Sequence, residues 1–371
     1  MQLGINGWRI HGQRTGVGRY LYNVVRHWDA ESLRRHGFDA ARLYTPAPFT
    51  DLPAGHALDI RVLSPPARML LWENLRFAPA AAEDVLFCPS YSRPLVARGR
   101  TVVALHDAMP ALHPEFFGRW SNRFYSRLYS WSGHHSALVL ALSEACRQDI
   151  HRGWGIPLGK IRVVHHAADD CFYPLRDRTS STDDRMRHFD IDAPYFVFVG
   201  KMTGRRSIPL LLQAFAEFAR GTALPHLLVL AGKKPTHFDL DAEIRRLGVE
   251  SRVRQTGFVD DVDLNLLYNF SDALVMPARY ESGSLPIMEA QRAGAPVICL
   301  DTAGTREFAG GIACMVKTMA SSLLAQAMRD IATQSALRQE LREAGLEHAK
   351  KFSWGRTAEL TLEVLADAGR R

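Results

Sequence analysis

The sequence predicts an α/β protein made of two doubly wound domains, each built on a parallel sheet. Short apolar runs alternate with segments of helical period along the whole chain, which is the pattern of repeated βαβ units. Several of these runs lead into loops that hold Gly, Ser or Asp and then into a helix. At 371 residues with 47% hydrophobic content, the chain is also long enough for two domains of ordinary size.

The predicted strands are short apolar runs, as expected for strands that helices cover on both faces. In chain order they are residues 101–105, 137–142, 161–164, 195–199, 226–230, 253–256, 273–276 and 297–300. The carboxyl ends of parallel strands share one edge of a sheet, and ligands of doubly wound sheets bind there. We therefore expect the ligand in a cleft that the two domains face.

A polar segment marks the predicted domain boundary. Residues 175–193, LRDRTSSTDDRMRHFDIDA, are charged and poor in apolar side chains. We interpret residues 181–193 as a linker between a first domain at residues 1–180 and a second domain at residues 194–352.

Composition excludes several classes of protein. No run approaches 18 consecutive apolar residues, and the start, MQLGINGWRI, lacks the charged-then-apolar order of a signal peptide. These features predict a cytoplasmic protein without a membrane span. The five cysteines include no C-x-x-C pair, so neither a zinc site nor a disulfide framework is expected.

The net charge of +7 comes entirely from the first half of the chain. Residues 1–180 hold 22 Lys and Arg against 15 Asp and Glu, whereas the remainder holds 24 of each kind. Aromatic residues lie among the arginines at residues 114–131, PEFFGRWSNRFYSRLYSW. Such a surface could bind nucleic acid, anionic lipid headgroups or a pyrophosphate-bearing acceptor. For most of these aromatics we favour burial in the core.

The stretch ARYESGSLPIMEAQRAGAPVICL, residues 278–300, predicts a loop, a short helix and a strand. Pro286 suits the first turn of a helix, with Ser284 or Leu285 as the N-cap. Gly294, followed by a proline, ends the helix, and the apolar run 297–300 then forms a buried strand.

Two glutamates flank the start of this helix, Glu281 before it and Glu289 about one turn inside it. The free amides of Gly283, Ser284 and Leu285 suit a phosphate group, and a carboxylate one turn along could accept hydrogen bonds from a ribose diol. The stretch therefore indicates a nucleotide diphosphate site. An ordinary surface helix with a solvated Glu289 fits the local pattern equally well.

Two further loops suit phosphate. The strand YFVFVG is followed by KMTGRRSIP, which places Lys201, Arg205 and Arg206 just before a helix. In HGQRTGVGRYLYNVV, Gly16 and Gly18 precede a helix, although the full dinucleotide fingerprint is absent. Basic loops are common, so each signal is weak alone, but together they put phosphate-suited elements on both predicted domains.

At this level of detail the sequence resembles a retaining GT-B glycosyltransferase of the mannosyltransferase-rich family that builds polysaccharides and glycolipids from nucleotide sugars. The motifs that carry the resemblance run along nearly the whole chain: TGVGRYLYNVV, ALHDAMP, ALSEACRQDI, KIRVVHHAADDCFYP, VGKMTGRRS, TGFVDDVDLNLLY, ARYESGSLPIMEAQRAGAPV and KFSW. The paired glutamates with seven residues between them are that family's most diagnostic feature. The resemblance implies two Rossmann-like domains that face a central cleft.

The resemblance also implies roles for individual residues on the reaction side of the donor. Gly16 would approach the phosphate or sugar of the donor, and His106 would touch the donor sugar beside the reaction centre. Lys201 and Arg206 would bind the diphosphate.

The remaining implied roles concern the base, the ribose and the transferred sugar. The backbone around Phe258 and Val259 would hold the base, Glu289 the ribose, and Glu281 the hydroxyls of the transferred sugar. The last helix, at residues 353–371, would cross back onto the first domain.

The sequence departs from the family pattern at several positions. Ser282 stands where glycine is usual, so the loop reads ESGSLP in place of E-G-F-G-L-P. The first basic residue is Lys201, a point charge without the planar fork of arginine. His165 and His166 stand where N-G-V-D is common, and we interpret them as structural.

The resemblance implies a metal-independent enzyme without a cofactor, because cations and helix amides can stabilise the leaving diphosphate. The resemblance also implies that the acceptor attacks on the face that the diphosphate leaves, while Glu281 holds the sugar. We expect GDP-mannose as donor ahead of UDP-sugars, and a glycan or lipid-linked sugar as acceptor. Nucleic acid is not expected as a partner, whereas an anionic membrane surface would place the protein at the inner membrane face.

Two alternatives remain open at this point. A metal-dependent transferase of another fold could use one of three Asp-x-Asp pairs, which begin at residues 190, 239 and 261. A non-catalytic binder of membranes or nucleic acid would explain the basic first half, but it would leave Glu281 and Glu289 without a role.

Overall fold

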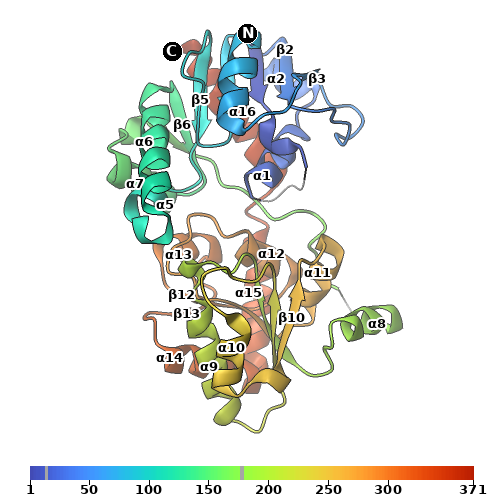
Figure 1. Ribbon diagram of the computed structural model, residues 1–371. Coiled ribbons are helices and arrows are strands. Elements are labelled where there is room, and N and C mark those ends of the chain that lie inside the picture. Colours follow the sequence, from blue (N-terminus) through green and yellow to red (C-terminus); the bar gives the residue numbers. More distant parts are fainter. Residues whose placement is uncertain (13–15, 176–178) are drawn as a thin grey trace. The chain divides into compact units, whose positions relative to one another are not determined.

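The computed structural model describes residues 1–12, 16–175 and 179–371, and it contains two parallel sheets (Figure 1). The chain divides into two units, one made of Met1–His166 with Phe352–Arg371 and the other of Ala167–Lys351. Each sheet belongs to one unit, so the predicted α/β fold with two doubly wound domains is confirmed.

The first unit holds seven parallel strands in the order β3-β2-β1-β4-β5-β6-β7. Their bounds are β1 Gln2–Asn6, β2 Ala40–Thr45, β3 Leu58–Val62, β4 Val85–Cys88, β5 Arg100–Ala104, β6 Leu138–Ala141 and β7 Ile161–Val163. The helices are α1 Val17–Val25, α2 Ala30–Arg35, α3 Met69–Trp72, α4 Ala78–Ala80, α5 Met109–Leu112, α6 Arg119–His135, α7 Glu144–Trp154 and α16 Trp354–Arg370. A π-helical segment, η2 Glu73–Phe77, joins α3 to α4, and 3₁₀ turns lie at η1 Trp8–Ile10, η3 Pro114–Phe116 and η4 Leu158–Lys160.

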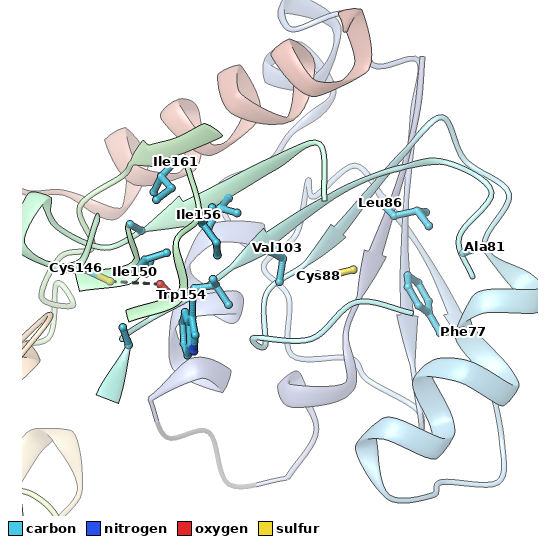
Figure 2. Close-up of a cluster of buried hydrophobic side chains, with 14 of the residues drawn as sticks. Phe77, Ala81, Leu86, Cys88, Val103, Cys146, Ile150, Trp154, Ile156 and Ile161 are labelled. Carbon is cyan, nitrogen blue, oxygen red and sulfur yellow. Dashed lines mark hydrogen bonds between the residues drawn. The ribbon is translucent and has the colours of Figure 1, made fainter. Parts of the chain in front are cut away.

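The core of this unit is a layer of apolar side chains between the central strands and the helices that cover them (Figure 2). Phe77 from η2 and Trp154 from α7 pack against it from two sides. The Cys146 thiol is buried there and donates a hydrogen bond to the Leu105 carbonyl at 3.4 Å. Close packing of this kind on both faces explains why these strands are nearly pure apolar runs.

The final helix, α16, packs on the first unit, as the sequence predicts. The Trp28 indole donates to the Ala358 carbonyl at 3.1 Å, and the Thr357 hydroxyl donates to the His165 carbonyl at 2.7 Å. Leu362 and Leu365 on the same helix are fully buried. Residues from the far end of the chain therefore complete the core of the first unit.

The second unit holds six parallel strands in the order β10-β9-β8-β11-β12-β13. Their bounds are β8 Tyr195–Val199, β9 Leu227–Ala231, β10 Val253–Gly257, β11 Ala273–Met276, β12 Val297–Leu300 and β13 Cys314–Val316. The helices are α8 Ser180–His188, α9 Ile208–Arg220, α10 Leu240–Leu247, α11 Asp261–Asn269, α12 Leu285–Ala293, α13 Ala303–Ala309, α14 Ser321–Thr333 and α15 Ser335–Ala349, with 3₁₀ turns η5 Gly204–Arg206 and η6 Glu250–Arg252.

All eight predicted strands are present, and β8, β11 and β12 match to the residue. Strands β1, β2, β3, β4 and β13 were not predicted. Strand β3 lies at the edge of its sheet, and only its first residue is buried, so its sequence carries little apolar signal. None of the described helices is long and apolar enough to cross a bilayer.

The predicted linker differs from what the structure shows. Residues 180–188 form helix α8, which begins with a capping box between Thr179 and Thr182. Arg185 on this helix lies 2.7 Å from the Asp263 carboxylate on α11. Local caps and charged pairs stabilise such a helix without a large apolar face, which is why composition alone indicated a linker. Arg176, Asp177 and Arg178, within the polar segment, lie outside the described residues.

The boundary between the units also comes earlier than residue 180. The Tyr173 amide donates to Asn265 at 3.1 Å, and the Leu175 amide donates to Asn269 at 2.7 Å. Both asparagines belong to α11, so this approach segment is already hydrogen-bonded to the second unit.

A buried carboxyl group joins the two central strands of the first sheet at their carboxyl ends. Glu73 is 0% exposed and accepts hydrogen bonds from Asn6 at 3.2 Å and from the Ser92 hydroxyl at 2.6 Å. Asn6 ends β1, and Ser92 follows β4. Burial raises the pKa of Glu73 to about 7, although both hydrogen bonds oppose the shift.

This carboxyl group makes stability depend on pH. Because its folded pKa lies above its ordinary value of 4.5, the stabilising contribution of Glu73 is present below pH 4.5 and is lost as pH rises through about 7. We expect wild type to lose on the order of 3 kcal/mol more than Glu73→Gln across that window. Urea unfolding at pH 4.5 and pH 8 measures the difference, with the exposed Glu340→Gln as control. Parallel pH profiles for wild type and Glu73→Gln would contradict this account.

Candidate functional site

The second sheet reverses its strand order between β8 and β11. The chain proceeds from β8 outward to β9 and β10, and it then returns to place β11 on the other side of β8. Loops that follow β8 and β11 therefore diverge, and the space between their starting points is where doubly wound sheets bind ligands. The loop after β8 carries Lys201, Arg205 and Arg206, and the loop after β11 carries Glu281.

The glycine directly after β8, Gly200, leaves room for the side chain of Arg206. Gly200 has φ +123°, and a Cβ placed on it would lie 1.7 Å from Nη1 of Arg206. That Nη1 donates to the Val199 carbonyl at 3.3 Å, so the guanidinium folds back over the end of its own strand. Only a residue without a side chain fits this position.

Glu281 lies between two arginines. Its Oε1 is 2.7 Å from Nη1 of Arg205 and 3.4 Å from Nε of Arg206, and the residue is 5% exposed. Nη1 of Arg205 also donates to the Tyr280 carbonyl at 2.8 Å, and the Arg279 amide donates to the Arg205 carbonyl at 2.8 Å. The loops after β8 and β11 are thus joined through both main chain and side chains.

The charges of this cluster do not cancel. Two guanidinium groups, on Arg205 and Arg206, surround the single carboxylate of Glu281, and the exposed Lys201 adds a third cation to the same loop. Burial lowers the pKa of Arg206, and the adjacent carboxylate acts in the opposite direction. An anionic ligand would offset the excess positive charge.

Helix α12 begins beside Glu281 in the way the sequence predicts. Ser284 is its N-cap, Pro286 lies in its first turn, and Gly294 ends it with φ +86°. The Ser284 side chain makes no capping hydrogen bond, and it is 1% exposed. Among the described residues its hydroxyl has no partner. Gly283 and Leu285 are half-buried, so the helix presents a buried hydroxyl and unbonded amides, which suit a phosphate.

Glu289 lies one turn inside α12 and is buried. Its side chain is 2% exposed, and Oε2 accepts a hydrogen bond from the Tyr268 hydroxyl on α11 at 3.0 Å. The alternative of a solvated Glu289 is therefore wrong. A carboxylate this deeply buried requires hydrogen-bond donors, which a diol could supply.

Phe258 and Val259 follow strand β10 at the same edge of the sheet. Phe258 is 71% exposed and Val259 is half-buried, and both come directly after Gly257, which has φ +70°. An exposed aromatic ring can stack on a flat heterocycle.

The other two predicted residues, His106 and Gly16, belong to the first unit. His106 is 7% exposed, and its Nε2 lies 2.7 Å from the Pro89 carbonyl oxygen. Burial lowers the pKa of His106, and a carbonyl oxygen can only accept, so Nε2 carries the proton of this hydrogen bond. Gly16 is the N-cap of α1 with φ +50°, and its carbonyl accepts from the Tyr20 amide. The Tyr20 ring lies 5.0 Å from His106.

Part of the predicted glycine loop, Gln13 to Thr15, lies outside the described residues. His165 and His166 are placed by contacts with α16 and the residues before it. The His165 ring lies 5.7 Å from Phe352, and the His166 ring lies 6.3 Å from Trp354. Burial, with the neighbouring histidines, lowers the pKa of His166 to about 3. The histidines therefore lie where the C-terminal helix joins the first unit.

The acidic pairs that could indicate a metal site are used mostly in helix starts and ion pairs. Asp239 caps α10, Asp241 lies 2.8 Å from Lys234, and Asp263 pairs with Arg185. In the part of the chain that the structure describes, one cluster of possible metal ligands occurs, formed by Asp169, Cys171 and Asp261.

Fold geometry adds residues that sequence reasoning missed. Arg205 was noted among the basic residues, but only the structure shows that it contacts Glu281 more closely than Arg206 does. Tyr268 lies twenty-one positions before Glu289, as the partner of that carboxylate, and no local motif marks it. Gly304 is a third, because a Cβ there would lie 1.6 Å from the Glu281 carbonyl oxygen.

Comparison with known families matches both halves of the chain. Residues 14–170 match the model for Glycosyltransferase Family 4, and residues 181–348 match the model for Glycosyl transferases group 1. Every strand of the two sheets except β1 lies within these two segments.

Individual relatives share only about a quarter of their aligned residues with this chain. O-antigen chain mannosyltransferase B of Escherichia coli is 26% identical over 256 residues, which cover 69% of this chain and 67% of that protein. Alpha-D-kanosaminyltransferase of Streptomyces kanamyceticus is 24% identical over 219 residues, which cover 57% of this chain and 56% of that protein. The chain thus matches between about half and two thirds of the length of these relatives.

Solved structures agree on the fold. HepE from Anabaena, in complex with UDP-glucose, superposes with a TM-score of 0.73 at 18% sequence identity, and the match covers 99% of this chain and 98% of that one. Together with the two matched family models, this places the chain among the GT-B glycosyltransferases, with a family 4 domain followed by a group 1 domain.

Proposed function

We propose that the protein is a retaining, metal-independent hexosyltransferase that moves a sugar from a nucleotide sugar to a glycan or lipid-linked acceptor in polysaccharide or glycolipid biosynthesis. The observation that carries the proposal is the buried Glu281, held by two arginines at the point where the second sheet reverses its strand order. A site with excess positive charge beside a helix N-terminus suits the diphosphate of such a donor.

The donor extends across the carboxyl edge of the second sheet. Its diphosphate lies at the N-terminus of α12, where the amides of residues 283–285 and the Ser284 hydroxyl supply donors. Arg206 and Lys201 add charge from the loop after β8. The ribose reaches Glu289, and the base lies against the main chain of Phe258 and Val259, with the exposed ring beside it.

Glu281 holds the transferred sugar and does not act as the nucleophile. Its Oε1 is already paired with Arg205, which fixes the carboxylate and reduces its nucleophilic character. Negative charge grows on the diphosphate as the glycosidic bond breaks, and Arg206 with the α12 amides stabilises that charge. The acceptor hydroxyl attacks on the same face, and a phosphate oxygen of the leaving group takes its proton.

For two residues of the first unit, His106 and Gly16, the proposed role is contact with the donor, as the family resemblance implies. The His106 ring is buried and held by the Pro89 carbonyl, so its orientation is fixed for contact with the sugar. Gly16, which has no side chain, lets the main chain at the start of α1 approach the phosphate or the sugar.

The relatives support an order of preference among possible donors, which differ in sugar and in base. One relative is named as a mannosyltransferase and another as a kanosaminyltransferase, and the HepE structure contains UDP-glucose. We rank GDP-mannose first and UDP-sugars next. A thermal-shift panel of GDP, UDP, ADP and their sugars tests the ranking, because a ligand of the native state raises its melting temperature. No shift with any member of the panel would count against the proposed donor site.

Glu289→Ala should weaken donor binding. Loss of a charged hydrogen bond to the ribose should cost about 1.5 to 3 kcal/mol of binding free energy. Calorimetric titration of the nucleoside diphosphate measures it, with Tyr268→Phe as a test of the supporting hydroxyl and the exposed Glu340→Ala as control. Because Glu289 is buried, Glu289→Gln provides a second variant that preserves the packing. Unchanged affinity in both Glu289 variants would exclude the ribose assignment.

Glu281→Gln should lower turnover more than it weakens binding of the bare nucleoside diphosphate. The bare diphosphate lacks the sugar that Glu281 is proposed to hold, and loss of the carboxylate leaves both arginines available to phosphate. Steady-state kinetics and calorimetry on the same variant separate the two effects. Equal loss of affinity for the bare diphosphate and the intact donor would instead place Glu281 in the phosphate or ribose site.

Arg206→Ala should cost on the order of 3 kcal/mol of transition-state stabilisation, comparable to the loss of one preorganised donor. Transfer should survive excess EDTA, because the cations of the protein replace a metal. Asp261→Asn and Asp263→Asn should have far smaller effects, and Arg206→Lys should retain part of the activity. Activity that is abolished by EDTA, restored by manganese and insensitive to Arg206→Ala would establish the metal-dependent alternative.

A further inference from the structure

Three large aromatic side chains of helix α6 are exposed to solvent. Trp120 is 80% exposed, Phe124 is 56% exposed and Tyr125 is 41% exposed, and Phe117 just before the helix is 36% exposed. The expectation that most aromatics of this stretch are core residues is therefore wrong for these four. Exposed aromatic side chains on one helix are unfavourable in water unless another surface covers them.

Small and polar side chains lie on the opposite, buried face of the same helix. Asn122 donates to the Pro110 carbonyl at 2.9 Å, and Ser132 is fully buried. A Cβ on Gly133 would lie 2.2 Å from the Cδ1 atom of Ile156, so a side chain there would force Ile156 to shift. Small side chains and the half-buried Tyr129 thus form the inward side of α6, and the three exposed aromatics lie on the other side.

Arginines accompany the exposed rings. Arg119, Arg123 and Arg127 are exposed and recur every four residues, so they share one side of the helix. The helix itself, RWSNRFYSRLYSWSGHH, contains no acidic residue. In the described structure none of these three arginines forms an ion pair, and the neighbouring Glu115 on η3 lies 3.2 Å from His113.

Another exposed apolar segment lies beside the end of α6. The Arg93 guanidinium lies 5.4 Å from the centroid of the Trp131 ring, and it donates to the His135 carbonyl. This contact ties to α6 the loop that carries Leu95 and Val96, which are 60% and 77% exposed.

We infer that the exposed face of α6 docks the protein on an anionic lipid bilayer, with the aromatic rings at the level of the headgroups and the arginines on lipid phosphates. Aromatic side chains are favoured at membrane interfaces, and guanidinium groups bind phosphate through paired donors. This inference deepens the proposed function, since it rests on an acceptor that is presented as a lipid-linked sugar.

The charge pattern favours a bilayer over a second copy of the chain. A symmetric contact through this face would set the three arginines of one copy against the same three of the other, and no carboxylate on the helix would offset them. A bilayer with anionic headgroups supplies the missing negative charge over the whole face.

Sedimentation with phosphatidylglycerol-containing vesicles tests the inference on the full chain. We expect binding at low salt, a marked loss at high salt, and little binding to vesicles of phosphatidylcholine alone. Arg123→Gln with Arg127→Gln should weaken binding roughly 25-fold, since each basic residue near an anionic surface contributes about fivefold. Trp120→Ala with Phe124→Ala should weaken binding at least tenfold and leave the melting temperature unchanged.

A charge-matched control lies in the second unit. Lys350→Gln with Lys351→Gln removes the same charge from an exposed helix end and should leave vesicle binding unchanged within twofold. No binding of wild type to either vesicle, or equal binding by the α6 variants and wild type, would overturn the inference. So would a dimer, or a complex with single-stranded oligonucleotide, that the α6 variants abolish while no vesicle binds.

The same proteins separate this inference from the proposed function. The α6 variants should keep the thermal shift caused by the nucleoside diphosphate, because α6 belongs to the first unit and contributes no residue to the donor site. If wild type fails to bind vesicles but the nucleoside diphosphate still raises its melting temperature, only the docking inference is refuted. Intact vesicle binding without any thermal shift would refute only the transferase proposal.

Discussion

The ion pairs between Glu281 and its two arginines are the constraint on which the rest of the second unit depends. A buried carboxylate is tolerated only when cations and hydrogen bonds compensate its lost hydration. Arg205 and Arg206 reach it from the loop after β8, so the loops after two neighbouring strands must keep one relative position. Gly200 and Gly304 are required for the same reason, since a side chain at either position would enter the space of the cluster. The geometry of this edge of the sheet is thereby fixed by the protein itself.

Sequence patterns predicted the second sheet better than the first, and exposure explains part of the difference, since β4 was missed although it is apolar and buried throughout. Strands such as β8 and β11 are covered on both faces, so every side chain is apolar and the run has sharp ends. An edge strand such as β3 exposes most of its residues, and its pattern merges with that of a loop. Helix α8 was missed because its stability comes from a capping box and a tertiary ion pair, neither of which changes composition.

The same distinction applies to the candidate site, where some features follow from local sequence and others depend on distant residues. The start of α12 follows from Ser284, a following proline and the closing glycine, all of which act within a few residues. The burial of Glu289 does not, because it depends on Tyr268 from another helix. Likewise, the alternation of rings and arginines in α6 was visible in the sequence, but which face turns inward depends on contacts with distant residues, such as that of Gly133 with Ile156. Local signals identify elements, whereas contacts between distant residues decide which side chains remain available.

Because α16 follows the second unit in sequence, the two units complete their folding at different times during synthesis. The second unit is continuous in sequence from Ala167 to Lys351, so it can fold as soon as the ribosome has released that segment. The first unit emerges earlier but cannot be completed, because the indole of Trp28 and the strands beside it lack the helix that covers them. Its partly open core must wait through the translation of a whole domain, a period in which chaperones would be most needed. The part of the protein made first is therefore the part finished last.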